Sequence, residues 1–241
     1  MPQTLANLDR LAPTIRAAVR ELGERILAEF GEAVLNWTIF GEAAAGVFDA
    51  QRHAVRSALV LAEADLEKLR NLAAQGDRFG KLRLVAPLIL TPQFLADSRD
   101  TFPLELIEIQ SRHITLIGQD AFAELSFADT DVRLQCEREM KTVLIALHQG
   151  LLSAQGQAKH LPGVVHHVVE RLSRTLRGIV WLKGIRKQQT LVELIAAVEQ
   201  FVPCRLPGIR QAVQGGASPN WDTYRQLYAD VEVLGALING W

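Results

Sequence analysis

Apolar residues recur along the first half of the chain with two different spacings, which predict an alternation of helices and strands. Pro13 suits the first turn of a helix, and apolar residues follow it at helical spacing up to Gly31. Residues 33–40 are β-branched and aromatic, which predicts a strand, and residues 55–61 form a second strand-like run. Further strands are expected over 82–90, 102–109 and 114–117, and a further helix over 64–75.

The second half of the chain carries helical spacing only. Apolar stripes predict four helices, over 131–152, 164–182, 191–201 and 221–238. Pro203 and Pro207 follow the third helix, and residues 215–220 (GGASPN) predict a turn before the last one. Four amphipathic helices with short connections favour an antiparallel bundle.

The change of pattern near 126–131 predicts a boundary between two domains. The expected fold class is α+β. Residues 1–126 are expected to form a mixed sheet with helices, and residues 127–241 an all-α bundle. The first part carries an excess of acidic side chains and the second an excess of basic ones, which agrees with two separate domains.

Composition and charge exclude several classes of protein. The chain is 49% hydrophobic and 22% charged, values typical of a packed globular protein. Its 26 basic and 27 acidic side chains leave a formal charge of -1, so no membrane partner is predicted and nucleic acid is not an expected one. Two cysteines cannot form a disulfide framework or a cysteine zinc site. No signal peptide and no apolar run of ~20 residues is found, which predicts a soluble cytoplasmic protein.

The most informative segment is 39–61, which reads IFGEAAAGVFDAQRHAVRSALVL. It combines a strand, a turn containing Gly41 and Gly46, and a return strand. Taken alone, such a turn suits any tight connection between two strands. Together with the order of the other elements and the bundle that follows, it resembles the opening of the polymerase-beta-like nucleotidyltransferases.

The resemblance implies a definite chemistry. In that superfamily a Gly-Ser dipeptide ends the first strand, and the turn cradles a phosphate. An Asp-x-Asp on the next strand then binds two magnesium ions, which clamp the reacting oxygens of phosphoryl transfer. Carried onto this chain, the resemblance makes Gly41, Glu42 and Gly46 the phosphate-binding turn, with His53 beside the cleft.

The residues of this chain differ from the family pattern at the positions of the serine and of both aspartates. Glu42 stands in place of the serine, and Ala54 and Arg56 stand in place of the two aspartates. Alanine has no ligand atom, and an arginine opposes the binding of a divalent cation. We therefore expect no metal site and no cofactor. The first hypothesis is an inactive member that binds a nucleotide, another anionic small molecule or a protein partner. In it, Arg56 pairs directly with phosphates.

The second hypothesis is an active nucleotidyltransferase that transfers a nucleoside monophosphate to a small acceptor. It needs magnesium and a rearranged acidic site built from Asp49, Glu42 and either Glu105 or Glu108. On a strand over 102–109 these two glutamates lie on opposite faces, so at most one reaches the cleft as the third carboxylate that the resemblance implies. The resemblance also offers Glu137 as a general base, although a surface pair with Lys141 is the favoured interpretation.

Two further patterns have structural explanations that we favour. A run of basic side chains over 171–187 suits a phosphate, an acidic partner or RNA, but equally a solvated helix face. The four histidines His148, His160, His166 and His167 lack the spacing of a zinc site. The sequence also leaves open whether the chain forms a homodimer.

Overall fold

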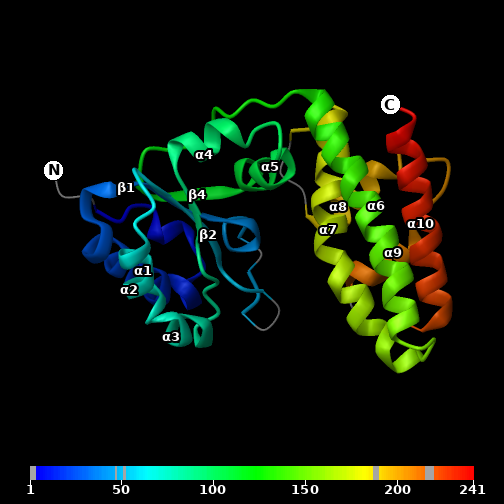
Figure 1. Ribbon diagram of the computed structural model, residues 1–241, viewed down its shortest axis with the longest axis horizontal. Helices are drawn as coiled ribbons and strands as arrows, with labels where there is room; N and C mark the ends of the chain where they lie inside the picture. Colours follow the sequence, from blue (N-terminus) through cyan, green and yellow to red (C-terminus); the bar gives the residue numbers. More distant parts are fainter. Residues whose placement is uncertain (1–3, 47, 51–52, 187–189, 215–219) are drawn as a thin grey trace. The chain divides into compact units, whose positions relative to one another are not determined.

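The computed structural model describes residues 4–46, 48–50, 53–186, 190–214 and 220–241, which fold as two compact units (Figure 1). The first unit comprises Met1–Arg99 and Glu108–Ser126, and the second comprises Asp100–Ile107 and Phe127–Trp241. The segment 100–107, which lies before the predicted boundary, therefore packs in the second unit.

A four-stranded mixed sheet forms the centre of the first unit, with strand order β3-β2-β1-β4. The central strand β1 (Val34–Phe40) pairs antiparallel with β2 (Arg56–Leu61) and with β4 (His113–Gly118). The short β3 (Leu88–Leu90) pairs parallel with β2. The predicted strands over 33–40, 55–61 and 114–117 are confirmed within a residue or two.

Helix α1 (Pro13–Phe30) buries one side in the core of the first unit. Its buried residues recur at helical spacing, as predicted, and they share that core with Trp37 of β1 and Leu116 of β4. The predicted helix over 64–75 is α2 (Leu66–Ala73), which begins where the Asp65 carboxylate accepts hydrogen bonds from two backbone amides.

The prediction of a strand over 102–109 is wrong, because this segment forms helix α5 (Pro103–Ser111). Its residues Leu104, Leu106, Ile107 and Ile109 are all buried. A helix that is buried on several sides needs no single apolar stripe, so an alternating pattern does not distinguish it from a strand. Pro103 at the first position favours the helix.

The predicted strand over 82–90 is largely absent. Leu84 makes an isolated bridge with Val55, and regular pairing begins only at Leu88. Pro87 lies between them and has no amide hydrogen to donate, which explains the interruption. Two short helices that were not predicted flank this segment, α3 (Gly76–Lys81) and α4 (Pro92–Asp97).

The second unit is a helical bundle, as predicted. Its helices are α6 (Asp129–Ser153), α7 (Leu161–Leu182), α8 (Leu191–Val198), α9 (Pro207–Gln214) and α10 (Trp221–Asn239). Apolar residues of α6, α7, α8 and α10 form one continuous core. No helix in the described part of the chain is both long and apolar enough to cross a membrane.

Helix α9 was not predicted. Pro207 occupies its first position, so this proline begins a helix rather than ending the previous one. The Asp230 carboxylate on α10 accepts a hydrogen bond of 2.9 Å from the Ile209 amide, which holds α9 against α10. The predicted turn over 215–220 lies outside the described residues except for Asn220, which caps α10.

Candidate functional site

The turn that follows β1 depends on glycine. Gly41 and Gly46 have φ angles of 77° and 74°, in the left-handed region that favours glycine. The Gly41 carbonyl accepts hydrogen bonds from the amides of Ala44 and Ala45, and the Gly41 amide donates to the Arg112 carbonyl. The amides of Ala44 and Ala45 are thus used within the turn, which reduces the number of donors that a phosphate would meet there.

Arg56 begins β2 directly opposite Phe40, the last residue of β1. Its guanidinium lies 4.5 Å from the centre of the Phe40 ring, and its Nη2 atom lies 2.7 Å from Oε2 of Glu108 on α5. The side chains of Arg56 and Glu108 are only 27% and 11% exposed. The residue that the resemblance assigns to the position of the second aspartate is therefore one half of a partly buried ion pair.

His53 is held by backbone contacts of the β1–β2 connection. Its Nδ1 atom accepts a hydrogen bond of 3.0 Å from the Asp49 amide, and its own amide donates to the Asp49 carbonyl. The His53 carbonyl accepts from Nε of Arg83. These contacts hold His53 by its backbone and its Nδ1 atom, while Ala54 beside it offers no polar side chain.

Glu105 belongs to the second unit, although it is three residues from Glu108. Its carboxylate accepts hydrogen bonds of 2.7 Å from Arg174 on α7 and from Gln135 on α6. The two glutamates that the sequence offered as a third carboxylate thus have separate partners, Arg174 for Glu105 and Arg56 for Glu108. Glu108 is the one that contacts a signature position.

The residues at the signature positions do not fit magnesium. Ala54 supplies no oxygen, Arg56 is a cation, and the Glu108 carboxylate is already paired. Among the residues that the structure describes, no group of three or more His, Cys, Asp or Glu side chains is arranged to hold a metal ion. Neither Glu42 nor Asp49 is part of such a group.

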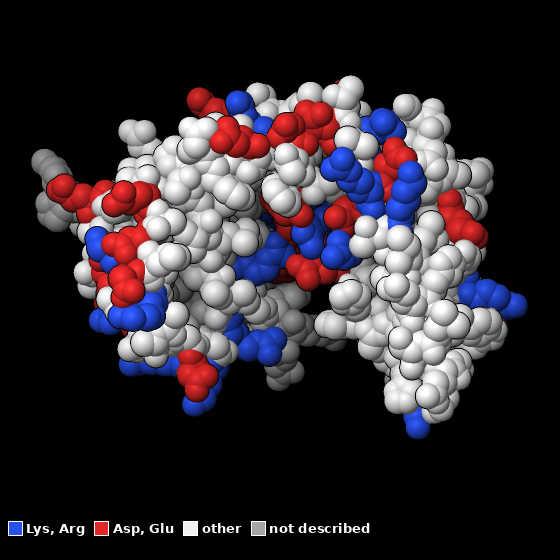
Figure 2. Space-filling view, viewed as in Figure 1, with Lys and Arg blue, Asp and Glu red and all other residues white. Residues whose placement is uncertain are grey.

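Two arginines of the basic run, both on α7, are paired with acids. Arg171 contacts Glu139 at 2.8 Å, and Arg174 contacts Glu105. Lys187, at the end of the run, lies outside the described residues. Figure 2 shows charged side chains gathered where α6 begins and α7 ends, whereas the other end of this helix pair is almost free of them. Arg171 and Arg174 are only 35% and 22% exposed, so these two residues differ from the solvated helix face that the structural interpretation predicted.

Glu137 lies between two cations of its own helix, Arg133 and Lys141. The hydrogen bond and charge of Lys141, followed by those of Arg133, lower the pKa of the Glu137 carboxyl. A general base works best with a pKa near the working pH, so these contacts suit the surface pair rather than a catalytic role. Of the histidines, His148 contacts the Tyr228 hydroxyl at 3.0 Å.

Sequence reasoning missed the pairing of Arg56 with Glu108. A signal for it was present, because an arginine in a partly buried position needs an acidic partner to offset the loss of hydration. The sequence did not identify that partner, because 102–109 was expected to be a strand. On a strand, Glu105 and Glu108 lie on opposite faces, and nothing indicated which of them faces Arg56.

The chain has the fold of the nucleotidyltransferases. A solved structure with this fold is the spectinomycin adenyltransferase from Enterococcus faecialis, crystallised with ATP and spectinomycin. The two structures align with a TM-score of 0.55 and 11% sequence identity, over 92% of this chain and 98% of the other. No family model matches the sequence, and no curated protein matches it. The similarity confirms the predicted α+β class and the nucleotidyltransferase-like architecture.

Proposed function

We propose that this chain is a nucleotidyltransferase-fold protein that does not transfer nucleotides and instead binds a nucleotide, or another phosphate-bearing anion, without a metal ion. The observation that carries the proposal is the Arg56–Glu108 ion pair at the start of β2. It stands where the family resemblance implies a carboxylate that binds magnesium. The likeness of the fold to an adenyltransferase crystallised with ATP supports a nucleotide as the anion.

The loss of catalysis follows from the charges at this position. Phosphoryl transfer assisted by two metals needs carboxylates that hold both ions against the attacking and leaving oxygens. Here one carboxylate position is an alanine and the other is an arginine. The remaining acid, Glu108, already neutralises that arginine.

The same arginine supports the binding of an anion. A guanidinium offers several N–H donors in a planar arrangement that matches a carboxylate or a phosphate. Glu108 contacts Nη2, and the Arg56 side chain keeps 27% of its surface exposed. A phosphate that approaches from solvent therefore competes with Glu108 for the guanidinium.

The alternative, an active enzyme with a rearranged acidic site, has less support. It needs at least two carboxylates on one magnesium ion, drawn from Asp49, Glu105 and Glu108. Glu105 and Glu108 are each paired with a different arginine. Among the described residues, Asp49 belongs to no group of three or more His, Cys, Asp or Glu side chains arranged to hold a metal ion.

The decisive experiment is a calorimetric titration of the full chain with ATP, in EDTA and in excess magnesium. We expect the same affinity in both conditions, loss of binding in Arg56→Gln, and tighter binding in Glu108→Gln. The last variant keeps the shape of the side chain but removes the charge that competes with phosphate. A parallel assay of pyrophosphate release with ATP and magnesium is expected to show no turnover.

Each other outcome selects a different function. Binding that requires magnesium, with turnover that is lost in Asp49→Asn or Glu105→Gln, would establish the active transferase. No binding in either condition would reject an ATP site and leave another anion or a protein partner as the ligand to test next.

A further inference from the structure

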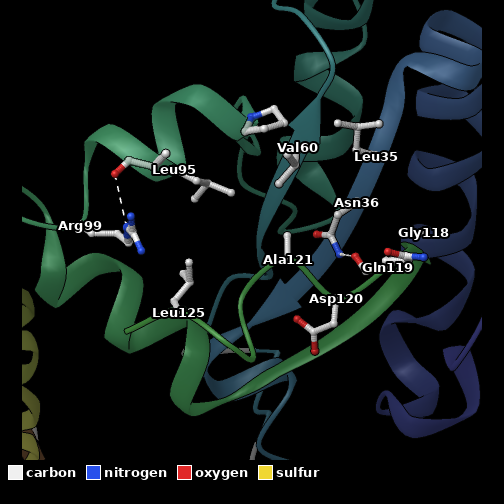
Figure 3. Close-up of a pocket in the computed structure, with 12 residues that line it drawn as sticks. Leu35, Asn36, Val60, Leu95, Arg99, Gly118, Gln119, Asp120, Ala121 and Leu125 are labelled. Atoms are coloured by element: carbon white, nitrogen blue, oxygen red, sulfur yellow. Dashed lines mark hydrogen bonds between the residues drawn. The ribbon is translucent and has the colours of Figure 1, made fainter. Parts of the chain in front are cut away.

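A cavity of about 700 Å³ opens on the first unit at the end of the sheet opposite to the Gly41 turn. Its walls include Leu35 near the start of β1 and Val60 near the end of β2, whereas Gly41 follows the end of β1 and Arg56 begins β2. Helix α4 and the segment after β4 complete the walls (Figure 3). The cavity is thus separate from the candidate site described above.

Most of the wall is apolar. In Figure 3 the side chains of Val60, Leu95, Ala121 and Leu125 point toward the same space. Leu35, on the neighbouring strand, keeps 40% of its surface exposed although it is a large aliphatic residue. A cavity of this size with a largely apolar lining and few polar groups is typical of sites for small molecules.

Two polar residues of the wall are used to build the site. Asn36 is buried, and its Nδ2 atom donates a hydrogen bond of 2.7 Å to the Gln119 carbonyl. Asp120 accepts from Nε2 of His113 at 2.7 Å, and also from the amides of Phe122 and Ala123. These contacts fix the segment after β4 and leave Asp120 as a satisfied carboxylate on one side of the cavity.

Arg99 is different from these residues. Its only hydrogen bond among the described residues runs from Nε to the Ala96 carbonyl, at 3.3 Å, and no acidic side chain in that part of the chain forms an ion pair with it. The two Nη atoms have no protein partner there. The wall therefore presents an arginine whose preferred partner, a carboxylate or another oxyanion, would come from a ligand.

We propose that this cavity binds a small amphipathic molecule with one anionic group. The apolar body packs against Leu35, Val60, Leu95 and Leu125, and the anionic group pairs with the Nη atoms of Arg99. Asp120, on the opposite wall, repels a second anionic group and selects monoanions over dianions. The site and its ligand are independent of the nucleotide proposed to bind at Arg56.

The test uses the fluorescent monoanion 8-anilinonaphthalene-1-sulfonate with the full chain. We expect Arg99→Gln to weaken its binding by about tenfold, the factor that accompanies loss of one hydrogen bond to a charged group. Arg70→Gln is the matched control, because Arg70 is an exposed arginine of the same unit whose ion pair is with the exposed Glu67, away from the cavity lining. A second variant, Ala96→Trp, fills the cavity and is expected to abolish binding without removing a charge.

Competition identifies the chemistry of the ligand. Octanoate is expected to displace the probe, whereas octanol, which has the same chain without the charge, is expected to displace it about tenfold less well, and octylamine not at all. Unchanged probe affinity in either Arg99→Gln or Ala96→Trp would overturn the proposal, as would equal displacement by octanoate and octanol.

Two further results separate this proposal from the proposed function. Probe binding is expected to persist in Arg56→Gln and in saturating ATP. If ATP shows no affinity for the chain, the response of the probe to Arg99→Gln still decides whether the cavity is a binding site. Displacement of the probe by ATP would place both ligands in one site and overturn the assignment to this cavity.

Discussion

Each end of the sheet in the first unit has an arginine, and the two arginines differ in whether the protein supplies an acidic partner. Where β1 meets β2 beside the Gly41 turn, Arg56 is partly buried and paired with Glu108. At the other end, Arg99 borders a cavity and makes no ion pair with a described residue. The first arginine is already neutralised by the protein, whereas the second has donors that only solvent or a ligand can use. The difference shows that the position of an arginine in the sequence does not reveal whether it can bind a ligand. Its partners in the folded protein must be known as well.

The largest effect is expected from restoring two carboxylates at the paired end. The double variant Ala54→Asp with Arg56→Asp removes the cation and places two acids beside Glu108. We expect magnesium or manganese binding to rise from undetectable to measurable, because hard cations bind clusters of carboxylate oxygens. Calorimetry with manganese measures it.

The single variant Ala54→Asp is the matched control, since it retains the Arg56–Glu108 pair and is expected to bind no metal. If the double variant also binds none, Ala54 and Arg56 do not stand at the positions that the family resemblance implies.

The next effect concerns the stability that the ion pair contributes. Glu108→Ala leaves Arg56 partly buried without its carboxylate, and we expect a loss of about 1–3 kcal/mol in the free energy of unfolding of the first unit. Glu67→Ala is the comparison, because the Glu67–Arg70 pair is highly exposed and its loss is expected to cost less than about 1 kcal/mol.

Urea denaturation followed by the fluorescence of Trp37 reports on the first unit, after Trp181, Trp221 and Trp241 of the second unit are replaced by Phe. Equal losses in Glu108→Ala and Glu67→Ala would mean that the Arg56–Glu108 pair behaves as a surface pair.

The smallest effect is expected at the cavity end, from the titration of Asp120. Burial raises the pKa of this carboxyl, but the hydrogen bonds from His113 and from the amides of Phe122 and Ala123 outweigh burial, and the net pKa is lowered. The folded state therefore prefers the ionised form. Its contribution to stability is present above the pKa of the unfolded chain and is lost as the pH falls through the folded value.

Because the Asp120 side chain is 39% exposed, solvent screens this contribution, and we expect it to be about 0.5 kcal/mol. Melting curves between pH 6 and pH 3 measure it, with a smaller decline in Asp120→Asn than in the unsubstituted chain. The same decline in both would mean that other carboxylates cause the loss of stability in acid.

Local patterns were enough to predict most of the fold. The helix after Pro13, the strands on both sides of the Gly41 turn and the amphipathic helices of the second half are all present. Each of them is defined by residues that are close in the sequence. The short helices α3, α4 and α9 were missed, and the predicted strands over 82–90 and 102–109 were wrong or incomplete. In 82–90 a proline interrupts an apolar run, and in 102–109 burial on several sides removes the periodicity.

The sequence by itself determined that a glycine turn precedes Ala54 and Arg56, and that neither of these residues is a carboxylate, because these are properties of residue type and local conformation. Only the tertiary structure decided that Glu108 rather than Glu105 pairs with Arg56, and that Arg99 borders a cavity. Those facts depend on which side chains meet across elements distant in the chain, and on how each helix is turned. The physical reason is that the interactions of a charged side chain depend on the groups around it in space, and the order of residues alone does not specify those groups.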